Sequence, residues 1–458
     1  MPGIGAPLSL EEARRYLMGR ARELGLSLEV YGERGTATTI QAFAGAVDEF
    51  KLSSRQGLGL RALINSAWGY AYTENLSPAA LDRALETASE NAALSAPLPQ
   101  AGLYAWGAPP EMDLHGEGLS GVSVQQKVNV AITLERAATA ADPRVKSVPY
   151  NAYSDGESLL SVDNTQGLER DYQALYAYAY LAPLVSEDGQ SKMKMAFQFS
   201  REFAQLDPTA TALEATRRSL ALLGAKPAPS GRFPVVIGAE CMAAFLAVYS
   251  GMFSAKQVQE GKSPLAGRLG EAVGSVLVTV IDDATLPQGM NSRPFDAEGH
   301  PSAPLTLLSG GVLRSYLHNS ETAAQAETQG SGSVQSTGHA SRDSYRSVVG
   351  VDVSNIYMLG GKASRAGLLR QMGTGLLLTD IQGAHAGANQ ITGDFSLQAE
   401  GFWVEGGEVA YPLEVFTVVG NFTELLAGVQ AAADDLTFTR YASGAPSVLV
   451  DGLSVGGE

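Results

Sequence analysis

Cysteine is almost missing from this sequence, because Cys241 is the only one and no disulfide can form within the chain. Such cysteine usage fits a reducing compartment. Basic residues are also few, with 32 Lys and Arg against 48 Asp and Glu and a formal net charge of −16. DNA binding depends largely on Lys and Arg side chains that neutralise phosphates. With this charge and no basic cluster, we expect no direct contact with nucleic acid.

Long apolar runs are missing as well. No stretch approaches the roughly 20 apolar residues that a membrane-spanning helix needs. The first residues, MPGIGAPLSLEEARRYL, lack the charged region and apolar core of a signal peptide. These absences predict a cytoplasmic protein without a membrane segment.

The residues that are present indicate a packed globular protein. Hydrophobic residues make up 45% of the chain and charged residues 17%, whereas disordered chains are poorer in apolar residues and richer in charge. A chain of 458 residues is too long for one ordinary domain, so we expect two or three.

The first part of the chain has the pattern of helices packed on an antiparallel sheet. Ser9 is a favourable N-cap, and apolar residues recur at helical spacing over 10–24. Residues 27–72 alternate in polarity and are broken by glycine, which indicates an antiparallel meander. Ser77, followed by proline, then predicts a second helix to about residue 93.

The same order of elements recurs further along the chain. A helix is predicted over 124–141, strands follow to about residue 200, and another helix is predicted over 208–223. Helices and strands are segregated rather than alternating, which favours an α+β fold over a doubly wound parallel sheet. The recurrence is consistent with internal duplication, although the sequence shows no clear repeat.

Beyond residue 224 the chain is mainly β, with short strands, glycine-rich turns and helices predicted near 364–372 and 423–433. Two stretches rich in proline and glycine divide the whole sequence into parts. We expect an N-terminal α+β domain, a linker, a middle α+β domain and a β-rich C-terminal domain, at 1–95, 96–122, 123–225 and 226–458.

Residue spacing gives little support for a zinc site. Catalytic zinc needs about three ligands from His, Cys, Asp or Glu, two of them usually one helical turn apart. The five histidines are scattered along the chain, at His115, His300, His318, His339 and His385. The spacing weakens the case for zinc, and only convergence of distant residues in space would restore it.

Two short motifs imitate catalytic or nucleotide-binding sequences. Residues 452–456 have the G-x-S-x-G spacing of a nucleophile elbow, but that motif must open a helix and this segment reads as a strand end. Residues 57–62 imitate a dinucleotide fingerprint, but their continuation is strand-like. We therefore interpret both segments as parts of strands.

Two acidic pairs, Asp282-Asp283 and Asp296/Glu298, are candidates for a paired general acid and base. Both lie in turn-rich sequence, and acidic residues are usually exposed. We therefore predict that they are solvated turn carboxylates.

Several long stretches match one protein family in the same order along the chain. They are 57–88, GKSPLAGRLGEAVGSVLVTVIDDATL (261–286), RPFDAEGHPSAPLTLLSGGVLRSYLHNSETAAQ (293–325), VSNIYMLGGKAS (353–364) and ITGDFSLQAEGFWVEGGEVAYPLEVFTVVGNF (391–422). They resemble the TldD/PmbA family of bacterial peptidases over nearly the whole sequence. The resemblance implies a metallopeptidase-like fold with a characteristic C-terminal domain.

In that family, the peptidase subunit carries a HExxxH helix with two His ligands and a Glu general base, and a cysteine near the C-terminus completes the zinc site. The corresponding segment here, 245–252, has Ala247 and Met252 in place of the histidines and Val248 in place of the glutamate. These side chains suit a packed core, in which case Leu246 and Met252 should be buried.

No shift of the alignment restores the site, because no histidine lies between His115 and His300. The C-terminal segment 440–446 lacks a cysteine, and Cys241 lies far upstream. The resemblance therefore implies a subunit without catalytic residues, metal ligands or a cofactor of its own.

By this resemblance the chain is a TldE-like subunit of a cytoplasmic protease that acts on unfolded peptides. A TldD-like partner would carry HExxxH and zinc, and the chain alone would form a homodimer. Residues 330–345, and within them Ser336, Thr337, Gly338 and His339, are the candidate wall of a peptide chamber. An ordinary flexible surface loop is the equal alternative, because its small and polar residues are common in such loops.

Two other functions remain open. One is a peptidase with an unrecognised site that includes His339 or His385. The other is a homodimeric interaction protein, for example a regulator of DNA gyrase.

Overall fold

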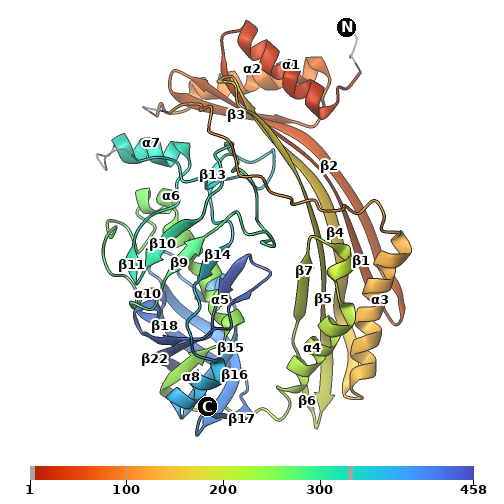
Figure 1. Ribbon diagram of the computed structural model, residues 1–458, viewed down its shortest axis with the longest axis vertical. Helices are drawn as coiled ribbons and strands as arrows, with labels where there is room; N and C mark the ends of the chain where they lie inside the picture. The colour runs from red at the N-terminus through yellow and green to blue at the C-terminus, as the bar shows by residue number, and fades with distance from the viewer. Residues whose placement is uncertain (1–5, 99–100, 329–333, 458) are drawn as a thin grey trace.

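The structure is a computed structural model that describes residues 6–98, 101–328 and 334–457. A tall curved sheet with helices at its two ends forms one body, and a compact C-terminal body lies beside it (Figure 1). The fold is α+β, with a largely β C-terminal part, as the sequence predicts. In the described part of the chain, no helix is long and apolar enough to cross a membrane.

One seven-stranded antiparallel sheet runs through both halves of the N-terminal body. Its strands are β3 (Ala67–Thr73), β2 (Ala46–Ile64), β1 (Ser27–Phe43), β4 (Val145–Asn164), β5 (Glu169–Glu187) and β6 (Gln190–Met193), with β7 (Ala196–Ser200) also paired to β5. The central pair is β1 with β4, from Glu29 opposite Asn164 to Ile40 opposite Tyr153. Strands from the predicted regions 1–95 and 123–225 therefore share a single sheet.

Four helices cover this sheet in two groups, and the sequence predicted the start of each. Near one end lie α1 (Leu10–Glu23) and α2 (Pro78–Leu94), and near the other α3 (Val124–Ala141) and α4 (Pro208–Leu220) (Figure 1). Ser9 accepts a hydrogen bond from the Glu12 amide, and the Glu12 carboxylate bonds back to Ser9, which forms a capping box. Each group encloses its own apolar core.

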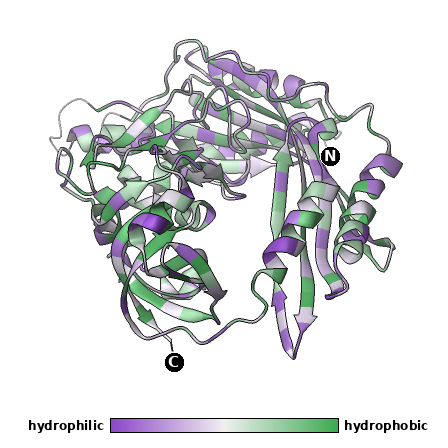
Figure 2. Ribbon diagram, turned by 60° about the horizontal axis from the view of Figure 1, so that its bottom comes forward, coloured by the Kyte–Doolittle hydropathy of each residue, from purple (hydrophilic) through white to green (hydrophobic). Residues whose placement is uncertain are grey.

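Alternation along the strands decides which face each helix group covers. On β5, Ala177, Ala179 and Leu181 are fully buried under α3 and α4, while the tyrosines between them face the other way. Figure 2 shows the resulting alternation of hydrophilic and hydrophobic residues along the long strands.

The C-terminal body contains two larger sheets. One holds β8 (Gly231–Ile237), β15 (Gly375–Gln382), β16 (Asp394–Glu405), β17 (Glu408–Pro412), β18 (Phe416–Asn421), β19 (Val429–Ala432) and β22 (Val448–Gly456). The other holds β9 (Val280–Asp282), β10 (Leu305–Ser309), β11 (Val312–Leu313), β14 (Ile356–Met358), β20 (Thr437–Phe438) and β21 (Ser443–Ala445). A short pair, β12 (Ala340–Ser341) with β13 (Gly350–Val351), lies apart from both.

Helix α5 (Ala239–Tyr249) packs between these two sheets and contacts strands of each. The other helices are α6 (Ala255–Gln259), α7 (Ser320–Thr328), α8 (Arg365–Met372), α9 (Ala384–Gly387) and α10 (Phe422–Ala427). The predicted helix near 364–372 is confirmed. The one near 423–433 is shorter than predicted, because Gly428 ends α10 and β19 follows directly.

The two strand predictions made against functional motifs are also confirmed. Residues 57–62 lie within β2, and residues 452–456 end β22. The glycines of β2 have a packing role, because a Cβ at Gly57 would overlap the Tyr345 ring and one at Gly59 would overlap the Tyr345 carbonyl oxygen. These glycines allow the C-terminal body to lie directly on β2.

We expect Gly59→Ala to destabilise the protein by about 1–3 kcal/mol, because the added methyl group must displace backbone of the other body. Thermal unfolding would measure the loss. Gly19→Ala is the control: Gly19 lies within α1 with nothing near its added Cβ, so alanine should stabilise by about 0.5–1 kcal/mol. Equal melting temperatures for the two variants would contradict this account of the junction.

Candidate functional site

Residues 245–252, which the sequence comparison above predicts to correspond to the family's zinc helix, are part of the apolar core. Leu246 and Met252 are 0% and 1% exposed, which confirms the prediction that both are buried. Ala247 and Val248 are partly buried on α5, and Met252 lies in the 3-10 turn that follows it. The core is tight here, since the Tyr249 ring stacks on Phe422 with centroids 4.7 Å apart.

The side chains at these positions do not fit a zinc ion. Alanine and valine have no donor atom, and a methionine thioether suits soft Cu(I) better than hydrolytic zinc. Cys241 lies on the same helix, and burial raises the pKa of its thiol, which disfavours the thiolate that binds metal. Within residues 6–98, 101–328 and 334–457, no three His, Cys, Asp or Glu side chains are placed to hold a metal ion.

The predicted chamber residues pack against other parts of the C-terminal body, among them His318 and Asp282. Ser336, Gly338 and His339 are buried and Thr337 is partly buried, while residues 330–333 lie outside the described residues. The Thr337 amide donates to the His318 carbonyl (3.1 Å). Gly338 has a φ of +78°, and a Cβ there would lie 3.0 Å from Nδ1 of His300. The fold thus brings His300, His318 and His339 into one region.

His339 occupies the middle of a hydrogen-bonded chain from Thr337 to Asp282. Its Nε2 lies 3.0 Å from Oδ1 of Asp282, and its Nδ1 lies 2.9 Å from Oγ1 of Thr337. Because a carboxylate only accepts, Nε2 must donate to Asp282, and Nδ1 of a neutral ring then accepts from the Thr337 hydroxyl. A hydroxyl, an imidazole and a carboxylate therefore stand in the order that a hydrolase uses.

Two contacts work against nucleophilic use of this threonine. Oγ1 of Thr337 accepts from the His318 amide (2.8 Å) and lies 3.2 Å from the His318 carbonyl oxygen. His339 is only 2% exposed. The arrangement is therefore well suited to tie β9 to the 336–339 segment. His385, the other histidine of interest, is exposed on α9 and takes no part.

The prediction that the acidic pairs are solvated is wrong. Asp282 is 0% exposed, Asp283 7%, and Asp296 and Glu298 2% each. Their charges are compensated within the fold: Asp296 accepts from three backbone amides, and Asp283 from the Thr285 amide and hydroxyl. Turn-rich sequence did not mean exposure, because other segments pack over these carboxylates: His339 and Ser354 contact Asp282, and Arg61 of the other body contacts Glu298.

Sequence reasoning missed the ion cluster that joins the two bodies, which we call the Arg61 cluster: Glu29, Arg61, Glu298 and Arg342. Arg61 contacts Glu29 at 2.8 Å and Glu298 at 2.7 Å, and Arg342 contacts Glu29 at 2.9 Å. All four side chains are 1–2% exposed. The partners lie far apart in sequence, so no local sequence pattern predicts the cluster.

The cluster also sets the protonation of its acidic neighbours. Burial acts to raise the pKa of Glu298, but the Arg61 charge and hydrogen bonds from Ser320 and Arg61 outweigh it, and the pKa is lowered. Burial, and then the Glu298 charge, raise the pKa of Asp296. The two carboxyls of this pair therefore differ in environment although only one residue separates them.

A row of aromatic rings forms a second candidate surface, on the face of β5 turned away from α3 and α4. The rings of Tyr176, Tyr178 and Tyr180 are stacked, with successive centroids 5.9 and 6.4 Å apart, and Phe197 of β7 lies 5.7 Å from Tyr178. All four side chains are half-buried. We call this row the tyrosine ladder.

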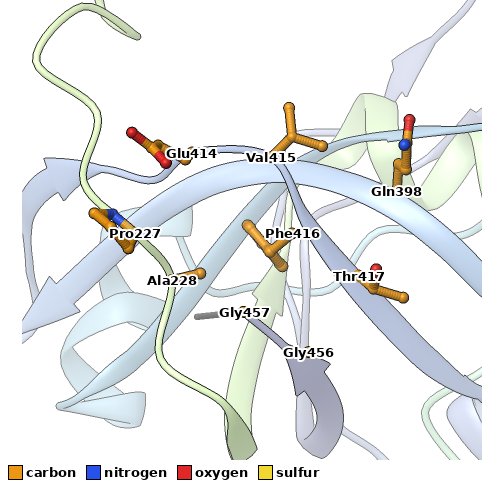
Figure 3. A pocket seen from close by; sticks show the side chains of 9 residues that line it. All are labelled: Pro227, Ala228, Gln398, Glu414, Val415, Phe416, Thr417, Gly456 and Gly457. Atoms are coloured by element: carbon orange, nitrogen blue, oxygen red, sulfur yellow. The ribbon is translucent and has the colours of Figure 1, made fainter.

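Two recesses on the surface lie away from the buried histidines. A cavity of about 270 Å³ is lined by residues of the C-terminal body, among them Gln398 and Glu414 (Figure 3). A groove of about 560 Å³ lies between β3 and α2 and is lined by residues that include Tyr70, Tyr72 and Arg83. Neither recess is lined by histidine or cysteine.

Models of one protein family match the chain in three consecutive parts. The PmbA/TldA metallopeptidase domain 1 matches residues 28–92, the central domain 117–223 and the C-terminal domain 230–457. Among curated relatives, Metalloprotease PmbA of Escherichia coli O157:H7 is 26% identical, and the match covers 98% of each chain. Metalloprotease TldD homolog of Haemophilus influenzae is 26% identical over 90% of this chain and 89% of its own.

Solved structures resemble the whole chain as well. A candidate modulator of a DNA gyrase from Thermotoga maritima MSB8 has a TM-score of 0.89 and 29% identity, with 98% of this chain and 100% of that chain covered. TldE from Thermococcus kodakarensis has a TM-score of 0.84 at 21% identity, with 97% and 100% covered, which shows the fold alone.

Acid should destabilise the protein through His318. Burial lowers the pKa of His318 from 6.5 to about 4. Between about pH 6.5 and 4 this histidine therefore binds a proton in the unfolded chain but not in the folded one. The free energy of unfolding falls by at most about 3 kcal/mol as a result. Denaturant unfolding across this range should show a smaller loss for His318→Gln than for the wild type. His385→Gln, at an exposed position, should keep the wild-type loss, and an unchanged slope in His318→Gln would contradict the assignment.

Restoring the family's metal residues should weaken the fold. The triple variant Ala247→His, Val248→Glu and Met252→His introduces polar and charged groups into the core, which costs several kcal/mol. We expect a lower melting temperature with or without zinc and no peptidase, because the third ligand and its supporting residues are also absent. Met252→Leu is the control and should cost less than about 1.5 kcal/mol. A stable triple variant that gains zinc-dependent cleavage would show that the site's architecture had survived.

Proposed function

Because the chain belongs to the TldD/PmbA family, as its matches to the three PmbA/TldA metallopeptidase domain models show, we propose that this chain is the metal-free subunit of a TldD/TldE-type protease. In this proposal the zinc and the HExxxH motif come from a TldD-like partner. The complex acts on unfolded peptides in the cytoplasm.

The observation that carries the proposal is which residues occupy α5 and the turn after it. Where the family's peptidase subunit has two histidines and a glutamate, this chain has Ala247, Met252 and Val248. The buried positions of Leu246 and Met252 support a structural use of the segment. A subunit of this kind contributes surface and shape, while its partner contributes chemistry.

The relatives support a partnership of two related chains. The family includes proteins called TldD homologues and proteins called PmbA or TldE. This chain matches both kinds over most of its length. A pair of homologous subunits, one with and one without the zinc ligands, accounts for these matches.

The features available for peptide binding are the tyrosine ladder and the groove between β3 and α2. Extended peptides are recognised by strand edges and by pockets for alternate side chains. The ladder repeats every 5.9–6.4 Å, close to the roughly 6.6–6.8 Å that separates alternate side chains of an extended strand. The 336–339 segment is a proposed part of the chamber wall through Thr337, which is partly exposed.

Two alternatives remain as separate outcomes. The Thermotoga protein is described as a candidate modulator of a DNA gyrase, so this chain is alternatively a homodimeric interaction protein. The Thr337–His339–Asp282 chain instead favours a metal-independent hydrolase.

We expect the purified chain to hold no stoichiometric zinc and to leave unfolded peptides uncut. Elemental analysis, and cleavage of unfolded protein or quenched fluorescent peptides, would measure both properties. Addition of a HExxxH subunit should give cleavage that a chelator abolishes. One tightly held zinc per chain with chelator-sensitive cleavage by the chain alone would contradict the proposal.

The same assay separates the alternatives. Cleavage by the isolated chain that resists the chelator and disappears in His339→Ala would favour the metal-independent hydrolase. No cleavage with any HExxxH subunit would favour the interaction protein.

A further inference from the structure

The first half of β2 is an unprotected sheet edge. On one side β2 pairs with β1, but on the other β3 covers only Leu58–Ile64. Residues 46–55 are exposed throughout. In the described part of the chain, no backbone hydrogen bond joins this stretch to anything beyond β1.

The exposed stretch carries apolar and charged side chains on opposite faces. Val47 and Phe50 lie opposite Ala42 and Ile40 of β1, on the face that packs under α3, and are 41% and 46% exposed. Leu52 shares this face and is 71% exposed. Glu49 and Lys51 project to the other face.

Such an edge is normally shielded, because its free amides and carbonyls are a template for pairing with another strand. The bulge at Asp48 and the charge of Lys51 protect it only in part, since three apolar side chains remain in water. A partner strand would satisfy the backbone and cover the apolar row together.

We propose that this partner is the same edge of a second copy of the chain, paired antiparallel about a two-fold axis at Phe50. In this register Phe50 faces Phe50 of the second copy. Glu49 faces Lys51 of the second copy, and the symmetry repeats that pair on the other side of the axis. The edge is therefore complementary to itself in charge, and the apolar row of one copy meets that of the other.

Neighbouring registers are less favourable. An axis at Lys51 would place two lysines directly opposite each other, which is repulsive. An axis at Leu52 would place Arg55 opposite Glu49 of the second copy, but Arg55 already contacts Glu33 of its own chain at 2.5 Å. The axis at Phe50 uses only charges that have no ion-pair partner within the described chain.

This contact goes beyond the proposed function and does not require it. It joins two identical chains through the N-terminal body, whether or not a metal-binding subunit also associates. Peptidase assays test the proposed function, and oligomeric state tests this contact, so each can fail without the other.

Cysteine cross-linking reads the register directly. In a Cys241→Ser background, Phe50→Cys would place two thiols on the axis, where Cα atoms are about 4.5–5.5 Å apart and a disulfide can form. Leu52→Cys is the matched control, since in the same register its two copies are about 14 Å apart along the strands. We expect mild oxidation to cross-link most of Phe50→Cys into dimers and little of Leu52→Cys. Cross-linking of Leu52→Cys in place of Phe50→Cys would overturn the register.

Charge reversal tests the pairing in solution. Sedimentation velocity should show a dimer for the full chain, with a dissociation constant raised about ten-fold or more by Glu49→Lys or by Lys51→Glu. The double variant Glu49→Lys/Lys51→Glu should restore dimerisation, because the pair is reversed rather than removed. A monomeric wild type at tens of micromolar, or single variants that dimerise as well as the wild type, would overturn the proposal.

Discussion

The arrangement of the two bodies depends on the Arg61 cluster. A guanidinium that is 1% exposed has no water to solvate it, so the carboxylates of Glu29 and Glu298 must do so. One of them comes from β1 and the other from the C-terminal body, and Arg342 links back to Glu29. Removal of one partner from such a group leaves an uncompensated charge, which costs about 3–5 kcal/mol. The cluster therefore favours one relative placement of the bodies, and in that placement Tyr345 lies directly on the β2 glycines.

Local features of the fold were predictable from the sequence, and long-range ones were not. Helix α3 runs over the residues predicted for it, because an N-cap, helical spacing and a following proline are all local signals. The pairing of β1 with β4 was not visible, since alternation shows that a strand exists but not which distant strand it joins. Helix α5 is apolar on every side apart from Glu240 in its first turn, so its sequence has no amphipathic period to detect.

The same difference between local and long-range information holds for the candidate site. Ala247 and Val248 carry no metal-binding atom and Met252 only a soft thioether, and this property of residue identity is read directly from the sequence. The burial of Asp282 and Glu298 depends on His339 and Arg61, which lie elsewhere in the chain. Turn-rich sequence gave the wrong expectation because it reports local backbone, and burial is decided by what packs on top.

The continuous N-terminal sheet has a consequence for the synthesis of this protein. Strand β1 leaves the ribosome with β2, but β4, its partner on the other side, is more than a hundred residues behind. At translation rates of about 5–20 residues per second, β1 waits roughly 5–25 s with one edge unpaired. During that interval the nascent hairpin presents free edges on both sides, which makes it a natural client for chaperones that bind emerging chains. Slow codons between the linker and β4 would lengthen this exposure, whereas those after residue 164 would not.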